Sequence, residues 1–319
     1  MNENDLIKNY LAKLANKNSP ALNLNDDVFF DKNKKLVISV DTYNEGIHFL
    51  NFKKPDLIMR KIIRSSISDI YAKGVKPNYF FLAGSGNKNH FTKKNMSLIN
   101  KSLSKEQNRF NIKLSGGDTT FSKNLSFTIM SLGYSDKIVY RNKAKNGDDI
   151  YITGNVGDSY IGLKALKNRI KLNSNQKKYF VDKYYSPNLP INFSSYLFKI
   201  ANCSIDISDG LVIDLNKLIN KQKLGYLIDI NKIPKSNNLK QLIKQKKLNK
   251  LDYLFNGDDY QILFTASKSK RKYIKTLSSK MNQKISIIGQ INTKSKNYLL
   301  DNRKISIKYL KYQGYSHTF

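Results

Sequence analysis

Apolar residues in the first half of the chain fall into short continuous runs and into longer stretches with helical spacing. The run at residues 36–40 (LVISV) is rich in β-branched side chains and predicts a strand that ends on Asp41. Residues 56–73 place isoleucines along one helical face, and Gly74 follows as a helix-terminating glycine. Further strands are predicted at 78–83, 111–115 and 125–133, and further helices at 4–16 and 92–109.

The second half continues the alternation of strand-like and helix-like segments. Residues 149–153 (DIYIT) predict a strand that enters a glycine turn at Gly154 and Gly157, followed by a helix to about residue 169. This alternation predicts an α/β fold or α+β layers, with a domain junction in the basic region 134–148. The predicted domains are 1–138 and 139–319. Additional strands are predicted at 204–207, 225–230, 260–266, 284–291 and 303–310, and a helix at 210–222.

Composition excludes several classes of protein. With 319 residues and 40% hydrophobic side chains, the chain can bury a sizeable core and is not a disordered tail. Cys203 is the sole cysteine, which excludes a disulfide framework and a cysteine-built zinc site. The first residues lack the basic-then-apolar pattern of a signal peptide, and no apolar run is long enough for a membrane helix. We therefore expect a soluble, cytoplasmic protein.

The charge is strongly positive, with 56 Lys and Arg against 24 Asp and Glu, a formal net charge of +32. Such a balance is typical of nucleic-acid-binding proteins. The excess is spread along the whole chain, however, and only 7 of the basic residues are Arg, the side chain that reads phosphates and bases bidentately. We favour a solvated Lys-rich surface without a specific nucleic-acid partner. A non-catalytic, basic nucleic-acid-binding protein remains the alternative.

The scarce acidic residues gather in short, turn-like stretches near predicted strand ends. Each could be an ordinary turn or helix cap, but together they favour a convergent site for a divalent cation. Mg²⁺ prefers oxygen ligands and binds through carboxylates together with substrate phosphates. The stretches are residues 26–27 (DD), Asp41, 68–69 (SD), 116–118 (GGD), 206–209 (DISD) and 257–259 (GDD).

The absence of two common phosphate-binding motifs limits the kinds of nucleotide site that the chain can form. The chain has no G-x-x-x-x-G-K-[ST] motif, which excludes a Walker-type loop, and residues 154–158 (GNVGD) lack the full dinucleotide fingerprint. Gly116 and Gly117 follow a predicted strand, and in a tight turn their backbone N–H groups could bind a phosphate. The remaining option is a nucleotide site made from carboxylate-held Mg²⁺ and a Gly-Gly turn.

The order of these motifs resembles that of the bacterial thiamine-monophosphate kinases. The resemblance covers about residues 20–319 with similar spacings, and nine motifs in sequence make it highly specific. The motifs are residues 25–27 (NDD), 39–42 (SVDT), 45–49 (EGIHF), 68–74 (SDIYAKG), 116–120 (GGDTT), 152–159 (ITGNVGDS), 206–211 (DISDGL), 256–260 (NGDDY) and 314–317 (GYSH).

The resemblance implies a two-domain fold similar to aminoimidazole ribonucleotide synthetase, whose N-terminal α/β domain pairs with its twin to form a barrel across a homodimer. It implies transfer of the ATP γ-phosphoryl group to thiamine monophosphate, giving thiamine diphosphate and ADP. The resemblance further implies a direct transfer, assisted by Mg²⁺ and without a covalent nucleophile. This agrees with the general rule that positioning and charge neutralisation dominate phosphoryl transfer.

Site residues follow from the same motifs. The implied magnesium ligands are Asp27, Ser39, Val40, Asp41, Asp69, Asp118, Asp206 and Asp209. The implied ATP contacts are Gly117, Asp118, Arg141 and Ser208. The implied contacts to thiamine monophosphate are His48, Asp258 and Tyr315, since a carboxylate and an aromatic face suit a thiazolium cation.

Four positions depart from the family pattern, and none of them removes a carboxylate ligand. Asn25 stands for a glycine, Val40 for a threonine, Phe121 for an arginine and Asp258 for a glutamate. If the contact at Val40 is made by the backbone carbonyl, valine serves equally. The nearest rivals are other ATP-dependent synthetases of the superfamily. Among these, selenophosphate synthetase needs a reactive residue near its N-terminus, and no cysteine precedes Cys203.

Overall fold

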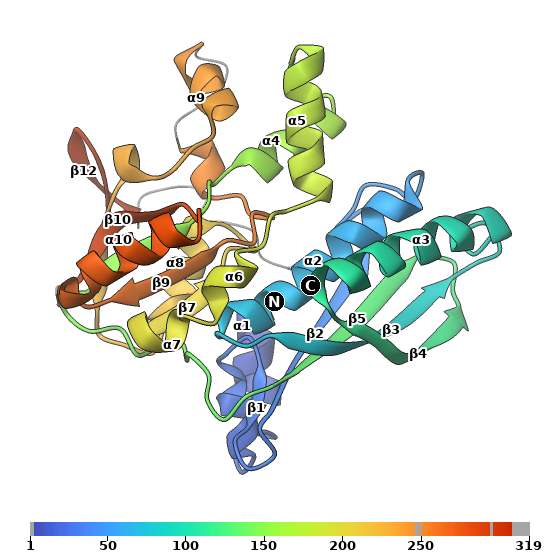
Figure 1. Cartoon of the computed structure of the whole chain (residues 1–319), viewed down its shortest axis with the longest axis horizontal. Coiled ribbons are helices and arrows are strands. Elements are labelled where there is room, and N and C mark those ends of the chain that lie inside the picture. The colour runs from blue at the N-terminus through green and yellow to red at the C-terminus, as the bar shows by residue number, and fades with distance from the viewer. Residues whose placement is uncertain (1–2, 246–247, 249–250, 294–295, 308–319) are drawn as a thin grey trace.

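The computed structural model of the chain describes residues 3–245, 248, 251–293 and 296–307. Within them the strands form two sheets, one in each half of the sequence, joined by residues 135–148, which contain no helix or strand. Figure 1 shows the two sheets side by side with helices packed on each. None of the described helices is both long and apolar enough to cross a membrane.

The first sheet has five strands in the order β1-β2-β5-β3-β4. Neighbouring strands pair antiparallel except β3 and β4, which are parallel. Because β4 is last in this order, it is an edge strand. Its strands are β1 (Phe29–Asp31), β2 (Leu36–Asn44), β3 (Pro77–Gly86), β4 (Lys113–Phe121) and β5 (Ser126–Tyr134).

Helix α2 (Pro55–Ala72) carries the apolar face that the sequence predicts and packs against β2 and β5. Helix α3 (Lys93–Phe110) packs beside it, so both cover one face of the sheet (Figure 1). Ile63 and Ile67 are fully buried, and each buried isoleucine contributes about 1.5–3 kcal/mol. Gly74 ends the helix with a φ of +82°, a conformation that favours glycine.

The second sheet has seven strands in the order β12-β11-β8-β10-β6-β9-β7, all antiparallel except the parallel pair β11 and β8. Helix α2 also contacts β7, so one helix touches both sheets. The strands are β6 (Asp149–Thr153), β7 (Cys203–Asp206), β8 (Gly225–Asp229), β9 (Ile262–Ala266), β10 (Ile285–Asn292), β11 (Asn297–Asp301) and β12 (Arg303–Ser306).

Helices of the second half surround this sheet, and Tyr184 and Tyr185 at the end of α5 are buried in the core beneath α2. The α-helices are α4 (Asp158–Leu166), α5 (Ser174–Tyr185), α6 (Ile191–Ser194), α7 (Leu197–Ile200), α8 (Leu211–Leu218), α9 (Asn237–Lys244) and α10 (Arg271–Lys280). Near the N-terminus lie α1 (Glu3–Leu6) and the π-helix Ile7–Leu11. Short 3₁₀ segments occupy Ser19–Leu24, Ile230–Lys232, Asp252–Leu254 and Lys268–Lys270.

Most predicted elements are confirmed, but two boundaries near the motifs are wrong. Strand β2 runs past Asp41 to Asn44, so this carboxylate lies inside a strand rather than at its end. Strand β4 continues through Gly116 and Gly117 to Phe121, so the expected Gly-Gly turn is extended strand. Backbone pairing extends both strands, a cause that side-chain pattern does not reveal.

Other differences are smaller. Helix α5 and strand β11 were not predicted, the helix expected at 4–16 ends at Leu11, and the helix expected at 210–222 ends at Leu218. The strand expected at 303–310 reaches Ser306, and residues 308–310 lie outside the described residues. The domain boundary at 138/139 stays a prediction.

Candidate active site

A cavity of about 700 Å³ lies where the two halves of the chain meet. Strand β2 and helix α2 line it from the first half, and the turn after β7, helix α8 and the 256–260 loop line it from the second. Predicted site residues that line this cavity are Asp27, Val40, Asp41, His48, Asp69, Asp206, Ser208, Asp209 and Asp258.

Three carboxylates make one end of the cavity strongly acidic: Asp41 on β2, Asp69 on α2 and Asp206 at the end of β7. Burial, with repulsion from Asp206, raises the pKa of Asp41 to about 7. Burial, with repulsion from Asp27, raises the pKa of Asp206 to about 6, and burial beside Asp206 holds the pKa of Asp69 well above its ordinary value. The side chains around these three carboxylates therefore do not neutralise their negative charge. A bound cation would neutralise it and favour the ionised form of the carboxylates.

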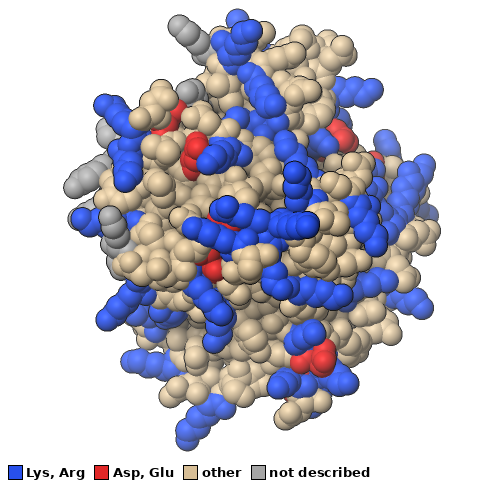
Figure 2. Space-filling model, turned by 60° about the vertical axis from the view of Figure 1, so that its left-hand side comes forward, with Lys and Arg blue, Asp and Glu red and all other residues tan. Residues whose placement is uncertain are grey.

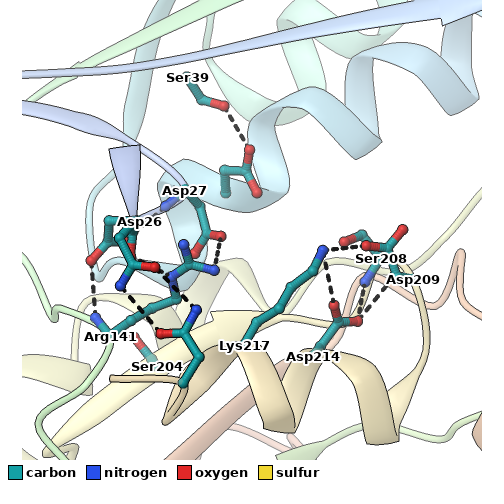
Figure 3. Close-up of polar contacts among 12 residues, drawn as sticks. Asp26, Asp27, Ser39, Arg141, Ser204, Ser208, Asp209, Asp214 and Lys217 are labelled. Atoms are coloured by element: carbon teal, nitrogen blue, oxygen red, sulfur yellow. Dashed lines mark hydrogen bonds and ion pairs between the residues drawn. The ribbon is translucent and has the colours of Figure 1, made fainter. Parts of the chain in front are cut away.

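Two serines on neighbouring elements orient these carboxylates. Ser39 lies on β2 and donates from Oγ to Asp69 Oδ2 at 2.6 Å (Figure 3). Ser68 on α2 donates to Asp206 and so connects the helix of the first half with the last strand residue of β7. Ser39 therefore lies beside Asp69 with its hydroxyl bound to the carboxylate, and its role as a metal ligand stays a prediction.

Asp26 and Asp27 lie beside this group but are neutralised by basic side chains. Lys73 Nζ lies 2.6 Å from Asp26 Oδ1 and 2.5 Å from Asp27 Oδ2. Arg141 Nη1 lies 3.4 Å from Asp27 Oδ1, and its Nε donates to Asn25 O at 3.1 Å. Burial alone raises the pKa of Asp27, but Arg141 and Lys73 outweigh it and lower the pKa to about 2.

The turn after β7 is fixed from behind by Asp214 on α8. This fully buried carboxylate accepts hydrogen bonds from the backbone N–H groups of Ser208, Asp209 and Gly210 at 3.0–3.1 Å (Figure 3). Lys217 pairs with the side chain of Asp209. The turn is therefore held rigidly, with Asp209 already bound to an ammonium group.

Another end of the cavity lining combines a carboxylate with aromatic rings. Asp258 Oδ1 accepts a hydrogen bond from the Tyr260 hydroxyl at 2.8 Å and lies 2.8 Å from Lys61 Nζ. Lys61 is buried beneath the cavity, 4.0 Å from the ring centre of Tyr184. His48 lines this end as well, and its Nδ1 accepts from the Asn44 backbone N–H at 2.9 Å.

Gly117 and Asp118 do not line the cavity. Asp118 on the edge strand β4 is paired across the strands with Ala83 on β3. The same row of paired residues continues with Thr128 on β5 and Thr42 on β2. Asp41 is in the adjacent row, so its side chain points to the opposite face of the sheet. Gly117 is required by close packing, because a Cβ there would lie 1.8 Å from the carbonyl oxygen of Leu82.

The remaining predicted residues are placed as follows. Ser39 and Arg141 adjoin the cavity through Asp69 and Asp27 rather than lining it. Tyr315 lies outside the described residues. Among the side chains that the structure describes, no group of three His, Cys, Asp or Glu is close enough to hold a metal ion by itself.

Comparisons with known proteins match both halves of the chain. Residues 24–135 match the family model for AIR synthase related protein, N-terminal domain, and residues 145–302 match the C-terminal domain. The thiamine-monophosphate kinase of Buchnera aphidicola subsp. Acyrthosiphon pisum is 33% identical over 90% of this chain and 88% of its own. That of Buchnera aphidicola subsp. Schizaphis graminum is 34% identical over 99% and 98%. The chain belongs to the thiamine-monophosphate kinase family.

The solved structures agree with the architecture of this thiamine-monophosphate kinase. The structure of AaThiL complexed with AMPPCP and TMP has a TM-score of 0.86, with 24% identity, and covers 99% of this chain and 97% of that one. The two-domain, AIR synthetase-like α/β fold is thereby confirmed. As a member of its family, the chain is an ATP-dependent enzyme that phosphorylates thiamine monophosphate.

Several residues that build the kinase site escaped prediction. Lys61 and Lys73 fall in an apolar helical stretch, where a lysine suggests a solvated side chain, yet both are almost fully buried. Asp214 has the pattern of an ordinary residue in the first turn of a helix. The one available signal is that the isoleucine-rich stretch 56–73 contains two lysines, Lys61 and Lys73. Elsewhere basic side chains, Lys and Arg together, are distributed over the visible surface, as Figure 2 shows.

Proposed function

We propose that the 700 Å³ cavity is the site in which this kinase transfers the γ-phosphoryl group of ATP to the phosphate of thiamine monophosphate. The observation that carries the proposal is that one cavity is lined by two different groups of side chains. One is a set of carboxylates without enough positive charge nearby, and the other is a carboxylate with tyrosine rings. A donor triphosphate with its cations suits the first group, and a cationic acceptor suits the second.

Mg²⁺ is proposed at the acidic end, held by Asp41, Asp69 and Asp206. These oxygen donors fit a hard divalent cation, and their raised pKa values indicate missing positive charge. Three ready-made ligands are not required, since Mg²⁺ usually binds through one or two carboxylates plus substrate phosphates. When bound, the ion would neutralise charge on the transferring phosphoryl group. The side chain of Val40 lies on the other face of β2, so only its backbone can contribute.

The chain's own residues would position the nucleotide. Arg141 is held by the 25–27 loop, with its backbone N–H donating to Asp26 Oδ2 at 3.0 Å, and its guanidinium can bind a phosphate bidentately. Ser208 lines the same end. Its backbone N–H donates to Asp214 and its carbonyl accepts from the Asp258 N–H, so it would contact ATP through its side chain.

The acceptor is proposed to bind beside Asp258, His48 and the tyrosines. Asp258 faces the cavity, and a φ of +67° brings its side chain between Lys61 and Tyr260. Burial lowers the pKa of Lys61, although Asp258 opposes this effect. The carboxylate would attract the thiazolium cation, and the aromatic rings would cover it. Tyr315 keeps its proposed role as a further contact to thiamine monophosphate.

Direct in-line transfer is the proposed chemistry. The phosphate of thiamine monophosphate attacks the γ-phosphorus of ATP, the bond to the β-phosphate oxygen breaks, and ADP leaves with that electron pair. The cysteine of the chain, Cys203, is fully buried in the core of the second sheet and does not reach the cavity. The protein's contribution is therefore alignment and charge compensation.

A homodimer is proposed to complete the site. Every residue of β4 is exposed, and Phe121 at its end is 82% exposed. Val40 and Tyr79, on the sheet face away from α2, are also exposed. A second copy covering this edge and face would form the barrel expected of the family. In that arrangement Gly117 and Asp118 would serve the nucleotide of the partner subunit, because their own cavity lies behind the opposite face.

Product analysis tests the proposal. Purified protein is incubated with ATP, thiamine monophosphate and Mg²⁺, and thiamine diphosphate is measured by HPLC beside an EDTA control and the Asp69→Asn variant. We expect product from the wild-type protein only with Mg²⁺, and at least a hundredfold less from the variant. Undiminished activity of Asp69→Asn would exclude the cavity as the active site. Undiminished activity in EDTA would exclude the metal.

A further inference from the structure

Lys73 is a charged side chain with no exposure to solvent, held at the acidic end of the cavity. It follows the last residue of α2, and its ammonium group has three partners. It lies 2.6 Å from Asp26 Oδ1 and 2.5 Å from Asp27 Oδ2, and it donates to Ser204 O at 3.0 Å. A buried ammonium is costly unless it is paired and hydrogen-bonded, and here both conditions are met.

These partners come from three separate segments. Asp26 and Asp27 belong to the loop before β1, and Ser204 belongs to β7, two residues before Asp206. The backbone of Lys73 is fixed as well, since its N–H donates to Asp69 O and its carbonyl accepts from the Val139 N–H, at 3.2 and 3.0 Å. The backbone from which the ammonium group extends is therefore fixed by the helix that presents Asp69 and by the segment that contains Val139.

The carboxylates of the cavity fall into two groups, according to whether a basic side chain forms an ion pair with them. Asp41, Asp69 and Asp206 have no ion pair with a Lys, Arg or His side chain in the described part of the chain. Asp27 has a lysine on one oxygen and an arginine on the other. A divalent ion at Asp27 would stand within about 4–5 Å of a fixed ammonium, where like charges repel strongly at low dielectric.

We propose that Lys73 is an internal counter-ion that takes the place of a divalent cation at the Asp26–Asp27 pair, so that Asp27 positions Arg141 instead of binding metal. This inference rests on the proposed magnesium site and revises the ligand set that the family resemblance implies. Lys73 is thus a positioning residue. It acts through the 25–27 loop, which holds Arg141 by the Asp26 side chain, the Asp27 side chain and the Asn25 carbonyl.

Counting bound Mn²⁺ tests the inference without measuring catalysis. Mn²⁺ is titrated into the full-length protein with AMPPCP present, and the bound ions are counted by electron paramagnetic resonance. We expect Asp27→Asn to bind as many ions as the wild-type protein, with affinity within about threefold. The matched substitution Asp69→Asn should weaken one site by about tenfold or more. Loss of a site in Asp27→Asn would overturn the inference.

The variant Lys73→Met supplies the complementary measurement. Without its ammonium, the Asp26–Asp27 pair should bind one more Mn²⁺ than the wild-type protein, and added Mn²⁺ should raise the melting temperature more than in the wild-type protein. An unchanged ion count in folded Lys73→Met would contradict the inference, because a purely structural lysine gains no metal site. If this variant does not fold, the number of Mn²⁺ ions bound by Asp27→Asn tests the inference alone.

A control separates the inference from the proposed function on which it rests. Lys61→Met removes a buried lysine within α2 that pairs with a single carboxylate, and this variant should bind no additional ion. Wild-type protein that binds no Mn²⁺ beside AMPPCP would refute the magnesium site itself. Lys73→Met would then still report whether the lysine excludes a cation.

Discussion

Ser68 on α2 donates a hydrogen bond to Asp206 at the end of β7, across the junction of the two halves of the chain. Both side chains are buried, with 2% and 3% of their surfaces exposed. The contact therefore does two things at once. It satisfies a buried carboxylate at the proposed magnesium site, and it helps to hold α2 against the second sheet.

Ser68→Ala should lower both stability and metal affinity. A buried carboxylate that loses a hydrogen bond costs about 1–3 kcal/mol of unfolding free energy, which urea denaturation can measure. The pKa of Asp206 should rise further, so Mn²⁺ affinity should fall at pH 7. Ser66→Ala is the matched control, because Ser66 on the same helix forms its hydrogen bond with the Ser131 hydroxyl, at 2.9 Å, and not with a carboxylate. Equal loss of Mn²⁺ affinity in both variants would contradict the assignment.

Without metal, stability should fall as the pH rises through the neutral range. The raised pKa values of Asp41, about 7, and Asp206, about 6, mean that protonation of these groups stabilises the folded state. That contribution is complete below an unfolded pKa of about 3.8 and is lost as the pH rises through about 7. The melting temperature in EDTA should therefore decrease from pH 5 to pH 8, and saturating Mg²⁺ should remove most of the decrease.

Asp41→Asn provides the check on this pH dependence. Asparagine keeps the shape of the side chain but cannot ionise, so the variant should be more stable than the wild-type protein in EDTA at pH 8 and should gain less from Mg²⁺. Asp27 works in the opposite direction, but its pKa of about 2 confines its effect to acid below about pH 4. A wild-type melting temperature that is flat from pH 5 to pH 8 would argue against mutual repulsion of the carboxylates.

The sequence predicted which residues build the acidic end better than it predicted how they are arranged. Helical spacing gave α2 and therefore the place of Asp69, since burial of isoleucines dictates that helix. Asp41 was expected at a strand end but lies within β2, because strand length depends on pairing with β5. The opposite orientations of Asp41 and Asp118 follow from register between strands far apart in sequence. The buried role of Lys73 depends on three segments meeting, which no local pattern encodes.

Asp258→Asn should raise the KM for thiamine monophosphate by about tenfold and that for ATP much less. The substitution keeps a partner for the Tyr260 hydroxyl but removes the charge that would attract the thiazolium ring. Steady-state kinetics with each substrate varied in turn measures the difference. Asp259→Asn is the neighbouring control. Asp259 is buried, accepts from the Gly157 N–H at 2.7 Å, and lines a separate, smaller cavity, so its loss should reduce stability rather than alter one KM. Equal KM increases for both substrates in Asp258→Asn would argue against its role.

Asp118 and Asp69 should complement each other between subunits. Asp118→Asn alone should lower turnover about a hundredfold, on the scale of lost electrostatic stabilisation, with no change in melting temperature because the side chain is exposed on β4. If each nucleotide is contacted by Asp69 of one subunit and Asp118 of the other, a mixed dimer of Asp118→Asn and Asp69→Asn chains has one intact site. Statistical exchange of subunits makes half of the dimers mixed, so about a quarter of wild-type activity should return. If both residues instead serve the same subunit's site, every site in the mixture carries one defect and no activity returns.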